Sequence, residues 1–400
     1  MRGATLWRLA LLAALLAAPW TLSAQWLGLL SQMGMAAVLC LSLWLLMGQG
    51  GMVSFGHALY SGLGGFVAVY TLQALAGSGQ ANLAWMAWMP VALTPLLAGL
   101  VVAMASWALG WLATRHHASM VFAMITLGLG ELAWVGAQMF PDVFGGEAGL
   151  SVDRTAGIAP GGINWGPAWQ FYLLVLTYTL LTMALIRGYT QTPLGRLLNA
   201  VRDNPTRVSF MGYDPRRIRH TAFVTAGFFA GMAGALVALF NERVSTEALS
   251  SHRSALVLVF TLMGGLSSMS GAVLGGVLMV LATVVLSSWT PAWLLYMGLA
   301  FVMVMLMAPG GLAQGLPAMG RTMRLHPLGA VCLALAAAAA GGLVEMAYQL
   351  RLASTLGPEV GYLGLVLDAH AASHWLAGLG LTAAGALGWH GARTRGRGTP

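Results

Sequence analysis

The sequence contains no lysine and few charged residues of any kind. Charged residues account for 8% of its 400 residues and hydrophobic residues for 58%, and the mean hydropathy is +0.78. An ordinary soluble domain carries about 25% charged residues. This balance excludes a soluble globular domain and predicts an all-α, polytopic integral membrane protein.

The absence of lysine also excludes a nucleotide site in this chain. A phosphate-binding loop of the form G-x-x-x-x-G-K-[ST] needs the lysine and the hydroxyl residue after it. The GQGG run after Met47 is followed by neither. Any ATP that drives the protein is therefore hydrolysed by a partner.

Cysteine is scarce as well. Cys40 and Cys332 lie in separate apolar runs, without a second cysteine or a histidine at ligand spacing. This predicts two small buried hydrophobic residues rather than a disulfide or a metal site. Asp368, His370 and His374 have a spacing that a metal could use, but no fourth ligand accompanies them. Because no motif frames a nucleophile either, we expect no metal, no bound cofactor and no enzymatic activity.

Long apolar runs fill the chain. Taking runs of roughly 17 to 25 apolar residues as membrane spans, we expect ten helices in the first part of the chain and two more near its end. The predicted spans are 6–22, 26–47, 52–76, 85–113, 118–140, 168–187, 221–241, 254–269, 271–289, 291–308, 328–347 and 371–390. The short run 254–269 could instead be a re-entrant segment.

The first run also imitates a secretory signal, because two arginines precede its apolar core and Ser23-Ala24-Gln25 follows it. A further apolar run begins at once at Trp26. We therefore expect residues 1–25 to be an uncleaved first span.

All nineteen basic residues are arginines. They lie between apolar runs and form no continuous basic face, which speaks against nucleic acid as a partner. Cytoplasmic loops are enriched in basic residues. With both termini in the cytoplasm, fifteen of the nineteen fall inside; only Arg154, Arg243, Arg253 and Arg351 fall outside. The outside loop Pro141–Pro167 is rich in glycine and proline and holds three acidic residues.

The cytoplasmic segment 192–220 has helix signals that a simple loop does not need. Thr192 and Asn204 each precede a proline, a pattern typical of an N-cap followed by the first residue of a helix. Apolar residues of the first helix recur at positions 194, 197, 198 and 201, which predicts one apolar face. The second helix should end at Gly212, a residue suited to a left-handed C-terminal position.

Two short helices that expose Arg207, Phe210 and Met211 would form a rigid knob suited to a groove in another protein. The alternative is a solvated loop whose arginines only set the orientation of the chain.

Several stretches resemble one family. TPLGRLLNAVRDNPTRVSFMGYDPRRIRHTAFVTAGFFAGMAGAL is similar to the signature region of the permeases of branched-chain amino acid ABC importers. GQGGMVSFGHALYSGLGGF, TLGLGELAWVG with FGGEAGL, LVFTLMGGLSSMSGAVLGGVL and MAPGGL resemble the same family in the same order. The resemblance covers residues 26–316, the expected permease core. Residues 317–400, with the last two predicted spans, form an extension outside it.

The resemblance implies a multi-pass permease of the bacterial cytoplasmic membrane that takes up branched-chain amino acids or similar small polar solutes. It implies a second related permease, two ATP-binding cassette ATPases and a periplasmic solute-binding protein as partners. It also implies that the segment 192–220 docks onto the ATPase. The candidate docking residues are Arg196, Asn199, Arg202, Asp203, Asn204, Pro205, Arg207, Phe210 and Gly212. The alternative function is a secondary transporter or channel for a small solute.

Polar residues at membrane depth are candidates for the translocation pathway. Glu131 lies deep in an apolar run, where a carboxylate is costly unless it is paired, solvated or protonated. It could line the pathway or be a hydrogen-bonded structural acid. His57 could likewise face the pathway or be a packing residue. Gln49, Ser54 and Ser61 add polar groups near it.

Small residues recur at helical spacing in three places. Because lipid provides little hydrophobic drive between helices, small faces allow the close approach on which packing depends. We expect helix crossings at Gly62, Gly65, Gly227, Gly231, Gly271 and Gly275.

Overall fold

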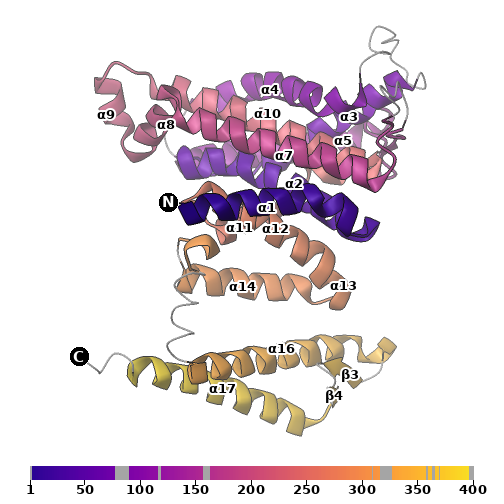
Figure 1. Cartoon of the computed structure of the whole chain (residues 1–400), viewed down its shortest axis with the longest axis vertical. Helices are drawn as coiled ribbons and strands as arrows, with labels where there is room; N and C mark the ends of the chain where they lie inside the picture. Colours follow the sequence, from indigo (N-terminus) through magenta and orange to yellow (C-terminus); the bar gives the residue numbers. More distant parts are fainter. Residues whose placement is uncertain are drawn as a thin grey trace. The chain divides into compact units, whose positions relative to one another are not determined.

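The computed structural model describes residues 2–76, 90–115, 119–155, 163–308, 310–315, 327–356, 359–362, 365–368 and 370–395 (Figure 1). The chain divides into two compact units, Met1–Leu281 and Ala282–Pro400. Each unit is described below by itself.

The first unit is built almost entirely of helices. Its long helices are α1 (Arg2–Thr21), α2 (Ala24–Trp44), α3 (His57–Leu75), α4 (Thr94–Ala113), α5 (Ser119–Met139), α7 (Ala168–Gln191) and α10 (Pro215–Asn241). Its shorter helices are α6 (Pro141–Phe144), α8 (Pro193–Asp203), α9 (Pro205–Phe210), α11 (Ser251–Gly264) and α12 (Met269–Val280). A π-helical turn, Leu45–Gln49, extends α2, and 3-10 turns cover Val91–Leu93 and Thr246–Leu249. Two short strands, β1 (Leu150–Ser151) and β2 (Arg243–Val244), pair antiparallel.

Seven described helices are long and apolar enough to cross a membrane. They are Ala24–Gln49, His57–Leu75, Val91–Ala113, Met120–Met139, Ala168–Gln191, Pro215–Asn241 and Met269–Trp289. The protein is therefore an all-α, multi-pass membrane protein, as the composition predicts. The expected count of about twelve spans is not confirmed by the described residues.

One difference arises where an apolar run is too short, whereas the helices at the last two predicted spans have 30 and 24 residues. α11 has 14 residues and ends at Gly264, so at 1.5 Å per residue it reaches about 21 Å, less than the ~30 Å hydrocarbon core. The predicted span at 254–269 is thus a short helix that does not cross by itself. Of the first predicted span, only Ala10–Thr21 forms a described apolar stretch. Residues 85–89 of the fourth predicted span lie outside the described residues.

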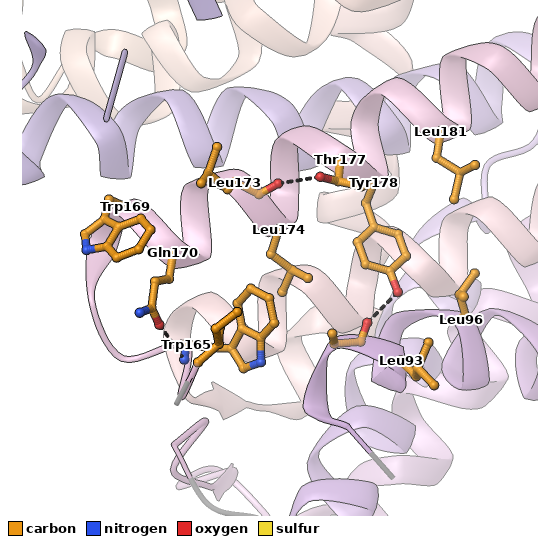
Figure 2. A pocket seen from close by; sticks show the side chains of 12 residues that line it. Leu93, Leu96, Trp165, Trp169, Gln170, Leu173, Leu174, Thr177, Tyr178 and Leu181 are labelled. Atoms are coloured by element: carbon orange, nitrogen blue, oxygen red, sulfur yellow. Dashed lines mark hydrogen bonds between the residues drawn. The ribbon is translucent and has the colours of Figure 1, made fainter. Parts of the chain in front are cut away.

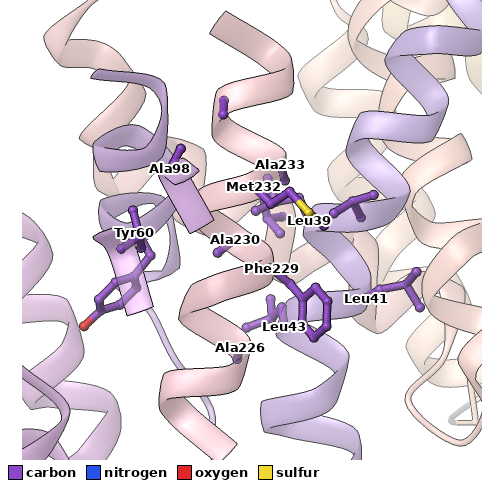
Figure 3. Close-up of a cluster of buried hydrophobic side chains, with 14 of the residues drawn as sticks. Leu39, Leu41, Leu43, Tyr60, Ala98, Ala226, Phe229, Ala230, Met232 and Ala233 are labelled. Atoms are coloured by element: carbon purple, nitrogen blue, oxygen red, sulfur yellow. The ribbon is translucent and has the colours of Figure 1, made fainter. Parts of the chain in front are cut away.

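The core of the first unit lies around α3 and α10. In each of these helices 72% of the most apolar stretch is buried, and α10 packs against α2, α3 and α4. Figure 3 shows Ala226, Ala230 and Ala233 of α10 facing neighbouring helices near Leu39 and Leu43 of α2. A Cβ added at Gly64 of α3 would overlap the backbone of Gly231. A Cβ at Gly234 of α10 would likewise overlap the carbonyl of Ser61 in α3, so the two helices approach this closely because Gly64 and Gly234 carry no side chain.

The other candidate packing glycines also lie at close approaches. A Cβ at Gly227 would overlap the hydroxyl of Ser106 in α4. One at Gly62 or Gly65 would reach Leu249 or Val244, and one at Gly275 would overlap the backbone of Phe260 in α11. Gly271 lies against the backbone of Gly265, where α11 turns into α12.

The two ends of α10 carry different structures. α8 and α9 directly precede its first residue, Pro215, and β2 directly follows its last, Asn241. The helix has 27 residues, which corresponds to about 40 Å. The segment α8–α9 and the β1–β2 pair therefore lie at opposite ends of the first unit (Figure 1).

The second unit contains α14 (Trp293–Met307), α16 (Pro327–Leu356) and α17 (Ala372–Arg395), with the short helix α13 (Ser287–Trp289) near its start. A second π-helical stretch, Leu281–Leu286, precedes α13. α16 packs against α17, and the antiparallel strands β3 (Glu359–Tyr362) and β4 (Leu365–Asp368) lie between them in sequence. The phenol hydroxyl of Tyr296 in α14 donates to Glu345 Oε1 at 2.8 Å and also lies 3.0 Å from the carbonyl of Gly341. This contact joins α14 to α16.

Candidate functional site

The segment 192–220 folds as the caps predict. The hydroxyl of Thr192 accepts the Gly195 amide at 3.2 Å and caps α8. The side chain of Asn204 accepts the Arg207 amide at 2.9 Å and caps α9. The same device occurs a third time where Asp214 accepts the Arg216 amide at 2.9 Å and caps α10. Each cap satisfies an amide that the first turn of a helix leaves open.

The third cap corrects the predicted start of a span. α10 begins at Pro215 rather than at residue 221, because Asp214-Pro215 carries the same start signal as Thr192-Pro193 and Asn204-Pro205. The sequence contained this signal. The span was predicted from hydropathy, which is low at the start of the helix because arginines occupy its first turns.

Two features fix the position of this segment: the buried face of α8 and the left-handed turn that ends α9. Leu198 and Val201 are fully buried, so α8 packs its apolar face on the body of the unit. α9 ends before Gly212, which has a φ of +86°. This left-handed conformation strains a residue with a Cβ, and glycine adopts it without that cost.

The far side of the segment is open and carries an unusual mixture of side chains. The exposed fraction of Phe210 is 87% and that of Met211 is 63%. Arg196, Asp203 and Arg207 are exposed beside them. Large apolar side chains next to guanidinium groups on a rigid element are suited to binding another protein. We call Arg207, Phe210 and Met211 the docking surface.

Two of the candidate docking residues turn inward instead. Asn199 Nδ2 donates to Gln49 Oε1 at 2.7 Å. Arg202 Nη1 donates to the carbonyl of Gly48 at 2.5 Å and its Nε lies 3.2 Å from Asp203 Oδ1. These two side chains join α8 to the end of the π-helical turn that extends α2. Gln49, a candidate pathway residue, is thus brought to the segment 192–220.

The remaining candidates near Gln49 lie inside the first unit. His57 begins α3, and its Nε2 lies 2.7 Å from the hydroxyl of Ser42 in α2. The hydroxyl of Ser61 donates to the carbonyl of Ala58 at 3.1 Å. Ser54 is fully buried, and neither its hydroxyl nor His57 Nδ1 has a hydrogen-bond partner among the described residues. In this chain His57 contacts a neighbouring helix.

Glu131 lies in a different setting. It is half-buried in α5, and no hydrogen bond or ion pair of the described residues includes its carboxylate. Only 28% of the most apolar stretch of α5 is buried. Gly130 beside it packs against Gly56, so Glu131 lies near the start of α3. A carboxylate so placed is costly unless it is protonated or meets water, a cation or a partner chain.

A cavity of about 420 Å³ opens between the start of α4 and the first half of α7 (Figure 2). Some of the polar groups of its wall are bonded within the protein. The hydroxyl of Tyr178 donates to the carbonyl of Ala92 at 2.5 Å, and Gln170 Oε1 accepts the Trp165 amide at 3.1 Å. What remains is apolar surface, including Leu93, Leu96 and Leu174. This wall is thus mainly apolar and contains no charged side chain to pair with a zwitterionic solute.

The outside loop caps the other end of the unit. Residues 150–152 pair with residues 242–244, and Arg154 lies 3.4 Å from Glu242 across this connection. Arg154 Nη2 also donates to the carbonyl of Gly166 at 2.9 Å. The hydroxyl and amide of Thr155 donate to Asp153 and lower the pKa of that exposed carboxyl. Residues 156–162 of the loop lie outside the described residues.

Sequence reasoning missed several contact residues. Ser42, Thr126 and Ser254 each bond to residues 55–58, at the start of α3. They stand as isolated hydroxyl residues in apolar runs, so no local pattern indicated them. In the turn after β4, the Asp368 amide donates to His374 Nδ1 at 3.0 Å and the His370 amide donates to Asp368 Oδ1 at 2.9 Å. Cys40 is a buried free thiol; the side chain of Cys332 lies outside the described side chains.

The fold and these elements define a class, that of multi-pass membrane permeases. Residues 25–309 match the family model described as branched-chain amino acid transport system / permease component. The chain belongs to this family.

Curated relatives agree with that family. The chain is 29% identical over 283 residues to the high-affinity branched-chain amino acid transport system permease protein LivM of Escherichia coli, and to the protein of the same name from Salmonella typhimurium. Each match covers 65% of this chain and 64% of the relative, less than two thirds of its length. A probable LivM of Methanocaldococcus jannaschii is 24% identical over 191 residues, covering 44% of this chain and 54% of the relative. No solved structure matches the chain.

Proposed function

We propose that this chain is the membrane-spanning subunit of an ATP-driven importer of the bacterial cytoplasmic membrane, in which partner ATPases hydrolyse the ATP. The observation that carries the proposal is the docking surface, Arg207, Phe210 and Met211, on a pair of capped helices at one end of α10. A subunit without a nucleotide site of its own needs such an element to receive motion from an ATPase.

The orientation follows from charge. Seven arginines lie between residues 187 and 219, at the end of the first unit that carries α8 and α9. The opposite end holds Asp142, Glu147, Asp153 and Glu242. Since basic residues are retained in the cytoplasm, the docking surface faces the ATPases and the β1–β2 end faces a solute-binding protein outside. Cytoplasmic termini belong to the same proposal, because with them fifteen of the nineteen arginines lie inside.

The solute is a branched-chain amino acid or a similar small polar molecule, as the names of the relatives suggest for this chain. The described cavity is apolar, so the polar pathway runs between this chain and a second permease subunit. Glu131 of α5 supports this arrangement, because its carboxylate has no partner among the described residues and needs one at membrane depth.

The energy source tests this function. The complete importer, in cells or proteoliposomes, should take up radiolabelled leucine in the presence of the binding protein encoded beside it. Uptake should persist when the proton gradient is collapsed and stop when ATP is depleted. Uptake that follows the proton gradient would instead indicate a secondary transporter.

The docking role has its own test in Gly212→Ala. An alanine at a φ of +86° is strained, although no atom lies within 4 Å of its Cβ. The substitution should misplace the docking surface and lower co-purification of the ATPase, while the permease still inserts. Gly188→Ala in α7 is the matched control, because its Cβ also meets nothing within 4 Å and its position is helical. Equal co-purification of the two variants would contradict the docking role.

A further inference from the structure

Residues Gly48–Gly56 connect α2 to α3, and no regular α-helix forms over this stretch. α2 ends in the π-helical turn Leu45–Gln49, and regular helix resumes at His57. Between them the backbone turns at Gly51, with a φ of +66°. We call residues Gly48–Gly56 the α2–α3 turn.

The first half of the α2–α3 turn is fastened to α8. Gln49 accepts a hydrogen bond from Asn199 at 2.7 Å, and the carbonyl of Gly48 accepts one from Arg202 at 2.5 Å. The backbone lies close enough that a Cβ on Gly51 would stand 2.6 Å from Cγ of Arg202. A Cβ on Gly50 would stand 3.3 Å from Cδ1 of Leu198. Both hydrogen bonds and apolar contacts thus join the first half of the turn to α8.

The second half of the turn is fastened to α5 and α11. The amide of Phe55 donates to the hydroxyl of Thr126 in α5 at 3.2 Å. A Cβ on Gly56 would overlap the carbonyl of Thr126, and Gly130 lies against the same glycine. The amide of Ala58, just beyond the turn, donates to the hydroxyl of Ser254 in α11 at 2.9 Å. The turn therefore ends next to Glu131.

These contacts form one continuous connection from α8 to α5. A packed, hydrogen-bonded segment without free space transmits a displacement instead of absorbing it. α8 adjoins α9, which carries the docking surface, whereas α5 carries the unpartnered carboxylate of Glu131. Hydrogen bonds thus tie one end of the turn to α8 and the other end to α5.

We propose that the α2–α3 turn couples α8 to α5 during transport, and that Asn199 and Gln49 are the positioning residues that hold the turn to α8. The inference rests on the proposed function. Motion of α8 and α9 reaches α5 through this turn, so loss of the Asn199–Gln49 bond separates ATP hydrolysis from solute movement.

The test measures leucine taken up per ATP hydrolysed, using the complete importer in proteoliposomes with its binding protein. Asn199→Ala and Gln49→Ala should each lower this ratio about fivefold or more, the range of a typical coupling between sites. The double variant should be no worse than either single variant, because both remove the same bond. The exchange Gln49→Asn with Asn199→Gln keeps an amide pair of the same total length and should restore the ratio.

Gln191→Ala, an exposed amide at the end of α7, is the control and should leave the ratio unchanged. Co-purification of the ATPase should be normal in all these variants. The inference is overturned if uptake and ATP hydrolysis fall in the same proportion, if both are unchanged, or if the ATPase is lost. Failure of the unmodified importer to couple leucine uptake to ATP would overturn the proposed function instead.

Discussion

The helices α10 and α5 are both apolar spans, yet their surroundings differ. In α10, 72% of the most apolar stretch is buried, and in α5 only 28%. The buried positions of α10 are mainly alanine and glycine, whereas α5 exposes Met120, Met124, Leu132 and Met139. The two helices have a similar mean hydropathy, 2.0 in α10 and 1.7 in α5. Residue size separates them, because small side chains permit close helix contacts and large ones face lipid or a partner.

The largest effect expected from this comparison is that of Gly231→Leu in α10. The new Cβ would stand 2.6 Å from Cβ of Val102 in α4, and α3 also crosses here through Gly64. The helices cannot move apart without losing the core, so we expect almost no folded protein. Size-exclusion chromatography of a fluorescent fusion in detergent would measure the loss.

The matched control is Gly136→Leu in α5, where a Cβ meets nothing within 4 Å. Its elution profile should resemble that of the unmodified protein. Similar losses for both variants would show that tight packing does not distinguish α10 from α5.

A substitution that leaves a cavity in the core should lower stability less than one that forces an overlap. The ring of Phe223 in α10 packs edge-on against Tyr60 at 5.3 Å and Phe122 at 5.7 Å between ring centroids, and it is 1% exposed. Phe223→Ala should lower the free energy of unfolding by about 3–5 kcal/mol. Thermal unfolding in detergent would measure it.

Met124→Ala in α5 makes a suitable comparison, because that side chain is 67% exposed. We expect a change within about 0.5 kcal/mol. A loss as large as that of Phe223→Ala would mean that α5 is packed in the isolated chain.

A smaller effect is expected at the buried pair of Ser42 and His57, which joins α2 to α3 over 2.7 Å. Ser42→Ala leaves the imidazole nitrogen without its partner, and such a loss costs about 1–3 kcal/mol. Thr225→Val is the control, since its exposed hydroxyl only bonds the carbonyl of Thr221 within the same helix. Equal melting temperatures for both variants would contradict a structural role of His57.

The smallest change in stability is expected for Glu131→Gln in α5, within about 0.5 kcal/mol. Its carboxylate has no partner in the described chain, so its removal breaks no contact there. If Glu131 lines the pathway, as we propose, leucine uptake by the complete importer should nevertheless fall. Unchanged uptake at normal expression would leave Glu131 without a part in transport.

The sequence predicted the helix starts of the docking segment well, because caps depend on a few adjacent residues. Thr192-Pro193 and Asn204-Pro205 specify their own helices, and Gly212 specifies its own turn. The number of spans was predicted less well. α11 shows why: hydropathy records that a run is apolar, but whether the run crosses or turns back at Gly265 depends on the helices around it.

In the candidate site, too, some features were predicted from the sequence and others were not. Phe210 and Met211 were predicted to be exposed, and they are. The pairing of Asn199 with Gln49 joins residues 150 positions apart, and both residues look like ordinary polar side chains in their local stretches. The sequence made Asn199 a candidate for docking in the segment 192–220 and Gln49 a candidate for the pathway.

The sequence by itself determined that this protein lies in a membrane and that two capped helices lie between its spans, and it predicted that the chain holds no phosphate-binding loop. These properties follow from composition and from interactions within one turn of chain. Only the tertiary structure decided that the α2–α3 turn connects α8 with α5, and that His57 contacts Ser42 in α2. Such contacts depend on which small faces of distant helices meet, and no local pattern carries that information.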